Sequence, residues 1–330
     1  MGFPRDSIAV VVPLAGVLYV RLASSVLGPG LGRIVALLPV LTFLAAVPLA
    51  FSSTILRGTA ALFLAWLCLF KVALLAVGSR PLDPALPVIP FVFTASLPVM
   101  PRRSCSGAKA NPGSGHVVSC AAKVAALAAI LQLNQFRNRV HLHARLALYG
   151  IELYCLFDLL LACLAAIGGA IGMDMERPFD CPILASSLSD FWGRRWNLVM
   201  SGILRASVYD PVQARVGKPA GIMATFLVSG LMHEAMMCYI TLRRPTGAML
   251  AFFVLHGAAR VAEDWCSARG LRPRPRAVRT LLVWVSLVST AFWLILPLVS
   301  MSGAEEKLLE ERAAVTAFFQ DAGRYLLPYR

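Results

Sequence analysis

The sequence predicts an all-α, polytopic membrane protein, a transmembrane helix bundle with about eight spans. The first observation is composition: 58% of the 330 residues are hydrophobic and only 15% are charged, which lies outside the usual range of soluble globular proteins. The second is that several apolar stretches reach the ~20 residues that an α-helix needs to cross the hydrocarbon core. A β-barrel would show short segments of alternating hydrophobicity, and the chain lacks them.

The expected spans are separated by charged or Gly/Pro-rich breaks. We predict spans at residues 8–27, 34–51, 55–77, 117–136, 146–172, 219–242, 246–262 and 278–301. The apolar segment 85–100 contains Pro87, Pro90 and Pro98, which favours an interfacial or broken helix over a complete span.

The chain shows no internal repeat and no separable soluble region, so we expect one integral membrane domain over residues 1–330. Its parts are N-terminal spans in 1–100, a core in 116–302 and an amphipathic interfacial tail in 305–330, where apolar side chains fall near helical spacing among charges. The basic loops do not fall on one side of the predicted spans, so the topology stays open.

Lysine and arginine number 31 against 17 acidic residues, a net charge of +14. The excess is spread between apolar runs, which favours loops at a cytoplasmic leaflet or an anionic substrate over nucleic acid. The eight cysteines form no C-x-x-C pair and lie mostly in apolar runs. They are typical of core hydrophobes in a reducing environment, not of disulfides or a metal site.

His233 and Glu234 are the ionisable residues in the middle of the predicted span 219–242. Such groups are expensive inside a bilayer and usually face a cavity or a partner. A structural histidine bonded to a neighbouring helix is the alternative. Helical spacing turns Glu234 away from the His233 face, so Glu234 is not an obvious partner of the imidazole. A neutral imidazole suits a general base that takes a hydroxyl proton.

The stretch DFWGRRWN, residues 190–197, follows a turn-rich segment and precedes an apolar one. Trp192 and Arg194, taken singly, are typical interfacial anchors of a membrane protein. Asn197 is not explained in this way. Because a buried amide needs hydrogen-bond partners, we expect Asn197 to face a polar group.

DFWGRRWN followed by an apolar span bearing SGLMHE resembles the membrane-bound O-acyltransferase (MBOAT) superfamily, and more closely its plant wax synthase branch, the long-chain-alcohol O-fatty-acyltransferases. The segments LPVLTFLAAVPLAFSS and LFKVALLAVGSRPLDP resemble the same branch. This resemblance implies that His233 is the catalytic histidine and that Asn197 occupies the upstream Asn or Asp position. It also implies location in the endoplasmic reticulum membrane.

The resemblance implies transfer of a fatty acyl group from acyl-CoA, a co-substrate, to a long-chain fatty alcohol, with no cofactor. His233 would take the alcohol proton, and Asn197 would position the histidine or a substrate oxygen or donate to the oxyanion. Arg194, Arg195 and Trp196 are expected to contact acyl-CoA, although lipid headgroups would satisfy the same arginines.

Three alternatives remain open from the sequence. The acceptor could be a sterol or a diacylglycerol, which are also hydrophobic alcohols. An acyl-enzyme on Cys238 is less expected, because this residue lies off the histidine face with no flanking base. A transporter could use His233, Glu234 and Asn197 to line a pathway, but the chain lacks paired broken helices in two halves.

Overall fold

The structure is a computed structural model that describes residues 3–102, 114–134, 141–271, 275–295, 297–298, 303, 306–311 and 313. Within these residues the regular elements are all helical, which confirms the predicted all-α class. The only β contact among them is an isolated bridge between Pro101 and Met175.

Each of the eight predicted spans contains helix. Five described helical segments are long and apolar enough to cross a membrane: Leu31–Ala50, Thr54–Ala76, Ala147–Ala170, Lys218–Thr241 and Arg276–Ile295. The proline-rich segment 85–100 forms only the short helix α5 (Val88–Ser96), as predicted. The predicted amphipathic tail lies mostly outside the described residues.

The chain forms two compact units, each assembled from segments distant in sequence. Unit 1 contains residues 1–97, 203–273 and 284–330, and unit 2 contains residues 98–202 and 274–283. That the chain acts as one acyltransferase domain stays a prediction.

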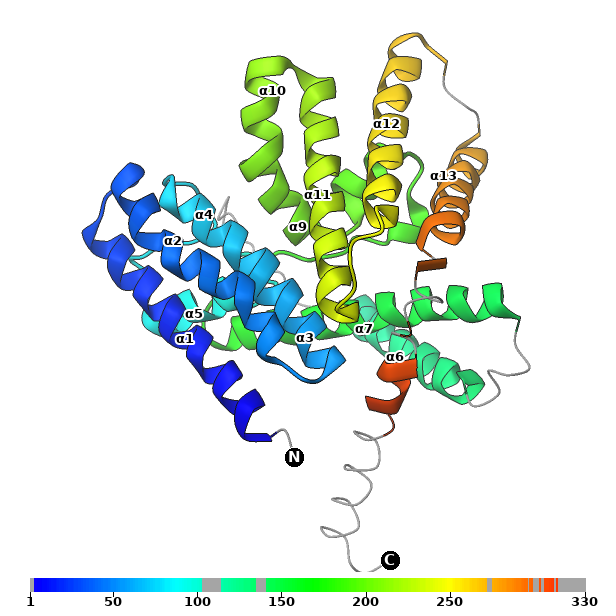
Figure 1. The fold of residues 1–330 in the computed structure, drawn as a ribbon. Coiled ribbons are helices and arrows are strands. Elements are labelled where there is room, and N and C mark those ends of the chain that lie inside the picture. Colours follow the sequence, from blue (N-terminus) through cyan, green and yellow to red (C-terminus); the bar gives the residue numbers. More distant parts are fainter. Residues whose placement is uncertain are drawn as a thin grey trace, which may run out of the picture. The chain divides into compact units, whose positions relative to one another are not determined.

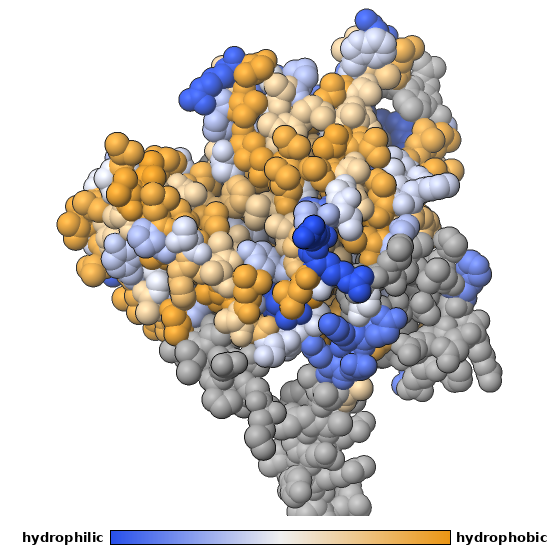
Figure 2. Space-filling model, in the orientation of Figure 1, coloured by the Kyte–Doolittle hydropathy of each residue, from blue (hydrophilic) through white to orange (hydrophobic). Residues whose placement is uncertain are grey.

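The first part of unit 1 is a group of packed N-terminal helices (Figure 1). These are α1 (Phe3–Val26), α2 (Leu31–Ala46), the 3-10 turn η1 (Val47–Ala50), α3 (Thr54–Ala60), the π-helix η2 (Ala61–Cys68) and α4 (Leu69–Ala76). Together with α5 they enclose an apolar core that includes Val17, Leu37, Leu44, Val72 and Phe91. Figure 2 shows that their outer surface is largely hydrophobic, as lipid-facing helices require.

Buried basic side chains in these helices bind the carboxyl ends of other helices. Arg33 donates to Ser24 O and Leu75 O, both at 2.9 Å. The Nζ of Lys71 donates to Thr94 O at 2.6 Å and Leu97 O at 2.7 Å. The last carbonyls of a helix lack intrahelical partners and carry partial negative charge. The N–H donors of Arg33 and Lys71 supply the missing hydrogen bonds there.

The second part of unit 1 is built on the hairpin of α11 (Lys218–Thr241) and α12 (Ala248–Ala268), which lie side by side in Figure 1. Two glycines permit their close approach. A Cβ added to Gly230 would lie 3.1 Å from Leu250 Cα, and one added to Gly257 would lie 2.9 Å from Phe226 Cβ. Small residues at helix contacts are typical of membrane bundles.

The remaining helical segments of unit 1 lie before and after the α11–α12 hairpin in the chain. The residues after the DFWGRRWN stretch continue through α9 (Leu198–Leu204), η6 (Arg205–Tyr209) and α10 (Asp210–Val216), and α13 (Arg276–Thr290) leads into η7 (Ala291–Ile295). Both α9 and α13 are shared between the units.

Unit 2 contains the antiparallel pair α6 (Ser114–Asn134) and α7 (Leu142–Ala170), which Lys123 and Asp158 join by an ion pair. Short elements follow: η4 (Pro182–Leu184), α8 (Leu188–Asp190) and the π-helix η5 (Phe191–Arg195). The DFWGRRWN stretch therefore lies in unit 2, whereas SGLMHE lies in α11 of unit 1.

The glycine contact between α11 and α12 makes a testable prediction. Gly257→Ala places a methyl group against the rigid Phe226 Cβ and should lower stability by about 1–3 kcal/mol through overpacking. Gly150→Ala is the control, because a Cβ on this α7 glycine meets nothing within 4 Å and alanine favours a helix. Melting temperatures in detergent should fall for the first variant only. Equal melting temperatures for both variants would contradict the close packing.

Candidate functional site

His233 projects from α11, and its two ring nitrogens have different environments. Nδ1 lies 2.8 Å from the carbonyl oxygen of Ser229, one helical turn earlier. A carbonyl oxygen only accepts, so Nδ1 carries a proton and the neutral ring presents its lone pair at Nε2. Among the described residues, no group forms a hydrogen bond with Nε2. The imidazole is therefore oriented, with one nitrogen available as a proton acceptor.

Two aromatic rings hold the imidazole from different helices. Phe253 of α12 stacks on it with ring centroids 4.2 Å apart, and Trp66 of η2 meets it edge to face at 4.6 Å. Phe253 and Trp66 are both buried. All three rings lie in unit 1. The ring contacts of His233 are therefore made by buried aromatic side chains. The sequence did not point to Trp66 or Phe253, since an aromatic residue in an apolar run has no distinguishing pattern.

Glu234, the neighbour of His233, has a different role. Its carboxylate accepts hydrogen bonds from the backbone N–H groups of Thr246, Gly247, Met249 and Leu250 at 2.6–3.3 Å. These groups begin α12 and lack intrahelical partners, and their dipoles favour a negative charge. Glu234 thus caps α12 and points away from the imidazole, as helical spacing predicted.

His256 is another buried histidine, on α12. Its Nδ1 lies 2.8 Å from Phe252 O, and its Nε2 lies 3.4 Å from Thr290 Oγ1. Both nitrogens therefore have neighbours within the protein. His233 and His256 differ in that only His233 keeps a ring nitrogen without a partner among the described residues.

Asn197, in unit 2, begins helix α9. Its Oδ1 accepts a hydrogen bond from Met200 N at 3.2 Å, and its carbonyl oxygen accepts from Ser201 N at 2.9 Å. Its backbone φ of 42° is left-handed, a conformation that asparagine tolerates better than most residues. These features give Asn197 a structural role that the sequence analysis did not foresee. Its side-chain Nδ2 remains able to donate.

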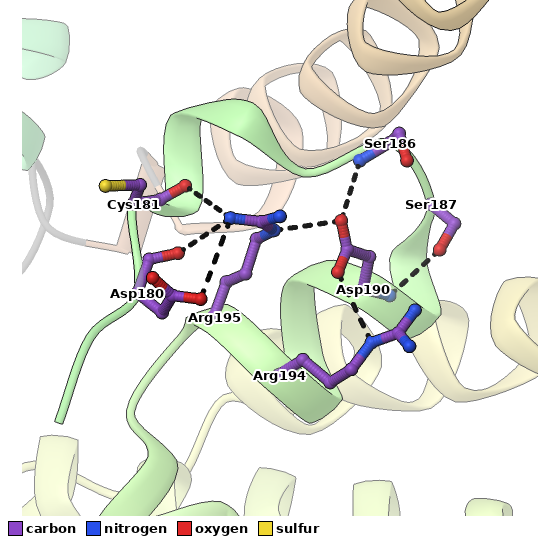
Figure 3. A network of polar contacts seen from close by, with 7 residues as sticks. All are labelled: Asp180, Cys181, Ser186, Ser187, Asp190, Arg194 and Arg195. Atoms are coloured by element: carbon purple, nitrogen blue, oxygen red, sulfur yellow. Dashed lines mark hydrogen bonds and ion pairs between the residues drawn. The ribbon is translucent and has the colours of Figure 1, made fainter. Parts of the chain in front are cut away.

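Asp190 is the centre of a polar network in the DFWGRRWN stretch (Figure 3). Its carboxylate accepts from Arg195 Nε at 2.9 Å and from Ser186 N at 3.2 Å, and Arg194 Nε lies 3.4 Å away. Burial alone raises the pKa of Asp190, but these hydrogen bonds and the two positive charges outweigh it, so the pKa lies below its ordinary value.

The two adjacent arginines differ in their surroundings. Arg195 is 18% exposed and also donates to Asp180 O at 2.9 Å. Its guanidinium therefore binds the backbone of the preceding loop. Arg194 is 72% exposed, and Figure 3 shows its Nε joined to the Asp190 carboxylate with the rest of the guanidinium beyond this contact. Of the two arginines among the predicted acyl-CoA contacts, Arg194 is the one with a largely exposed side chain.

Trp196, the third predicted contact, belongs to an aromatic cluster of unit 2. It stacks on Phe191 at a centroid distance of 5.4 Å and on Tyr154 at 6.0 Å, and it meets Phe179 edge to face at 5.2 Å. Aromatic pairs of this geometry stabilise a core. The contacts present in the structure therefore give Trp196 a packing role.

A cleft of about 490 Å³ in unit 2 is lined by Arg102, Glu176, Arg177, Asp180, Arg194 and Leu198. Arg102 lies 3.8 Å from the Asp174 carboxylate, and Arg194 is paired with Asp190. Arg177 has no ion pair among the described residues and is exposed. Three guanidinium groups at one cleft can bind an anion with several negative charges. Arg102 and Arg177 were not predicted from the sequence as ligand contacts, since neither stands in a motif.

The fold and these residues define a class: a polytopic helical membrane protein that holds an oriented imidazole within a span. Comparison with known proteins identifies the family. The model of the "membrane bound O-acyl transferase family" matches residues 175–255, which include both Asn197 and His233.

Curated relatives match most of the chain. "Probable long-chain-alcohol O-fatty-acyltransferase 1" of Arabidopsis thaliana is 36% identical over 89% of this chain and 90% of its own length. The "Long-chain-alcohol O-fatty-acyltransferase" of Simmondsia chinensis is 34% identical over 84% of each chain. "Acyl-CoA--sterol O-acyltransferase 1" of Arabidopsis thaliana is 31% identical over 94% of this chain and 95% of its own. The chain therefore belongs to the membrane bound O-acyl transferase family and is an acyltransferase.

The Asp190 network predicts an acid-sensitive contribution to stability. Because the folded-state pKa is depressed, this contribution is present above the unfolded pKa of about 3.9 and is lost as the pH falls through the folded pKa. Asp190→Asn should destabilise the protein by about 2 kcal/mol at pH 7 and progressively less as the pH falls below ~4.

Asp180→Asn is the matched control. The Asp180 carboxylate is 69% exposed and 4.0 Å from Arg195, and an exposed pair contributes little. Melting temperatures measured in detergent from pH 7 to pH 3 test both variants. A deficit for Asp190→Asn that stays constant over this range would rule out the ionised carboxylate as its source.

Proposed function

We propose that this acyltransferase moves a fatty acyl group from acyl-CoA to a long-chain fatty alcohol and forms a wax ester. The observation that carries the proposal is the His233 imidazole, which is oriented within a span and has no hydrogen-bond partner at Nε2 among the described residues. The names of the relatives supply the substrate class, because two of those reported above are long-chain-alcohol O-fatty-acyltransferases.

The proposed reaction is a direct transfer with His233 as general base. Nε2 takes the hydroxyl proton while the alcohol oxygen attacks the thioester carbonyl carbon. The tetrahedral intermediate then expels the CoA thiolate by breaking the carbon–sulfur bond. The proton on Nε2 passes to this thiolate, so the products are the ester and free CoA and the imidazole is neutral again.

Asn197 is proposed to act through Nδ2, since its Oδ1 already caps α9. The amide could orient a substrate oxygen or donate to the oxyanion. Asn197 and His233 belong to different units, so their presence in one site stays a prediction.

The acyl-CoA phosphates are proposed to bind the cleft of unit 2, at Arg102, Arg177 and Arg194. Guanidinium groups suit phosphate because they offer several donors in a planar fork, and the cleft is within the usual size range of ligand sites. Arg195 is assigned to the Asp190 network instead, because its donors already have partners there.

A sterol acceptor is the second candidate, and the similarity to a sterol O-acyltransferase supports it. We retain the fatty alcohol as the first candidate because the greater identity is to a long-chain-alcohol relative. The proposed location, the endoplasmic reticulum, follows from the family resemblance and is tested by fractionation of expressing cells.

The first experiment is an assay of yeast microsomes with radiolabelled palmitoyl-CoA and either a C16–C18 alcohol or a sterol. Wild-type protein should form wax ester. His233→Ala should reduce the rate by about 10²- to 10⁴-fold, the usual contribution of a general base. Asn197→Asp, which keeps the capping oxygen and loses the amide donor, should also lose activity while its melting temperature holds.

Glu234→Ala and Cys238→Ser are the controls. The first should lower the melting temperature by removing the α12 cap. Rates of His233→Ala are compared at matched amounts of folded protein, because this change also removes packing against Trp66 and Phe253. The second should remain active, because direct transfer does not use a thiol. Sterol ester without wax ester would contradict the proposed acceptor, and full activity in His233→Ala would contradict the proposed base.

The cleft makes a separate prediction. Arg177→Gln should raise KM for palmitoyl-CoA by about 3- to 10-fold through loss of a charge-assisted phosphate contact, with KM for the alcohol unchanged. Arg215→Gln removes an equal charge from exposed α10 and should change neither constant. An Arg177→Gln enzyme with wild-type KM, or an equal rise in both variants, would exclude the cleft as the phosphate site.

A further inference from the structure

Trp66 has a buried hydrogen-bond donor that the fold does not use. Its side chain is only 3% exposed, and its indole Nε1 has no hydrogen-bond partner among the described residues. Buried indole N–H groups usually find an acceptor, and one left unpaired lowers stability. An unpaired buried donor in a native structure therefore calls for an explanation, and a ligand that accepts the hydrogen bond supplies one.

The ring that carries this donor contacts the proposed catalytic base. The Trp66 ring lies edge to face with the His233 ring, at a centroid distance of 4.6 Å and an interplanar angle of 79°. His233 presents an unoccupied acceptor at Nε2. Adjacent rings therefore offer one unused acceptor and one unused donor in apolar surroundings. Acyl transfer needs both, because a proton leaves the alcohol while negative charge develops on the thioester carbonyl oxygen.

Local structure fixes Trp66 relative to α11. Trp66 lies in the π-helical stretch η2 inside the span Thr54–Ala76, and π-helical turns are frequent at functional sites. Nine residues earlier in the same span, Arg57 donates to Tyr239 O at 2.5 Å and to Ile240 O at 3.0 Å near the end of α11. This attachment holds the helix of Trp66 against the helix of His233, as a preorganised site requires.

We propose that the Trp66 indole N–H binds the thioester carbonyl oxygen of acyl-CoA and stabilises the oxyanion as the acceptor alcohol attacks. This assignment rests on the proposed acyl transfer with His233 as base. The alcohol oxygen bonds to the carbonyl carbon, its proton moves to Nε2, and the resulting charge on the carbonyl oxygen is held by the indole. Collapse of the intermediate breaks the carbon–sulfur bond and releases the donor.

The test separates the N–H group from the ring. Trp66→Phe keeps an aromatic ring and removes the donor. Trp66→3-benzothienylalanine keeps nearly the whole indole shape and replaces the N–H by sulfur. Both should lower kcat by about 10²-fold or more, the usual effect of removing one oxyanion donor, with KM for palmitoyl-CoA within about 2-fold, because the bond strengthens chiefly in the transition state.

Trp265→Phe is the control, because Trp265 is exposed on α12, and it should retain wild-type kcat. Rates are measured with whichever alcohol the wild type esterifies, so a sterol product would refute the proposed acceptor and leave the donor supported. Wild-type kcat in the benzothienyl variant would overturn the proposal. If Trp66→Phe alone lost activity, the ring and not its N–H would be needed, and Trp66 would have a packing role only.

Discussion

The structure depends on one constraint of the membrane: a helix that ends inside protein or lipid must find partners for its last backbone groups there, because water is absent. Buried basic and acidic side chains meet this need in unit 1. Arg33, Arg57 and Lys71 donate to carbonyls at the carboxyl ends of neighbouring helices, and Glu234 accepts from the N–H groups that begin α12. Donors lie at the carboxyl ends of helices, where partial negative charge gathers, and the Glu234 acceptor lies at an amino end, where partial positive charge gathers.

The same contacts fix the surroundings of His233. Glu234 ties α11 to α12, and Phe253 of α12 stacks on the imidazole. Arg57 ties the end of α11 to the span that carries Trp66, which meets the imidazole from the other helix. Ser229 O fixes the tautomer. Glu234 and Arg57 therefore have structural roles. The neutral imidazole of His233 has Nε2 available to accept a proton.

Much of this could be predicted from the sequence. Apolar length located the helices, and the spacing of Glu234 from His233 correctly separated their faces. The roles of Arg57 and Trp66 could not be predicted, because their contacts join residues far apart in the chain and neither stands in a recognisable motif. Asn197 was expected to face a polar group, but its left-handed backbone and its capping oxygen depend on a local turn that residue type alone does not specify. Arg195 was expected at a ligand, and its partners Asp190 and Asp180 O became evident only in the folded loop.

The most direct test of the central claim, that Nε2 of His233 accepts the alcohol proton, is chemical rescue. Purified His233→Ala enzyme would be assayed with increasing concentrations of imidazole, alongside Glu234→Ala enzyme. The account predicts that imidazole restores ester formation to His233→Ala in proportion to the concentration of its neutral form and leaves Glu234→Ala unchanged. A folded His233→Ala enzyme that needs no imidazole for wild-type rates, or that regains no activity at any concentration, would contradict it.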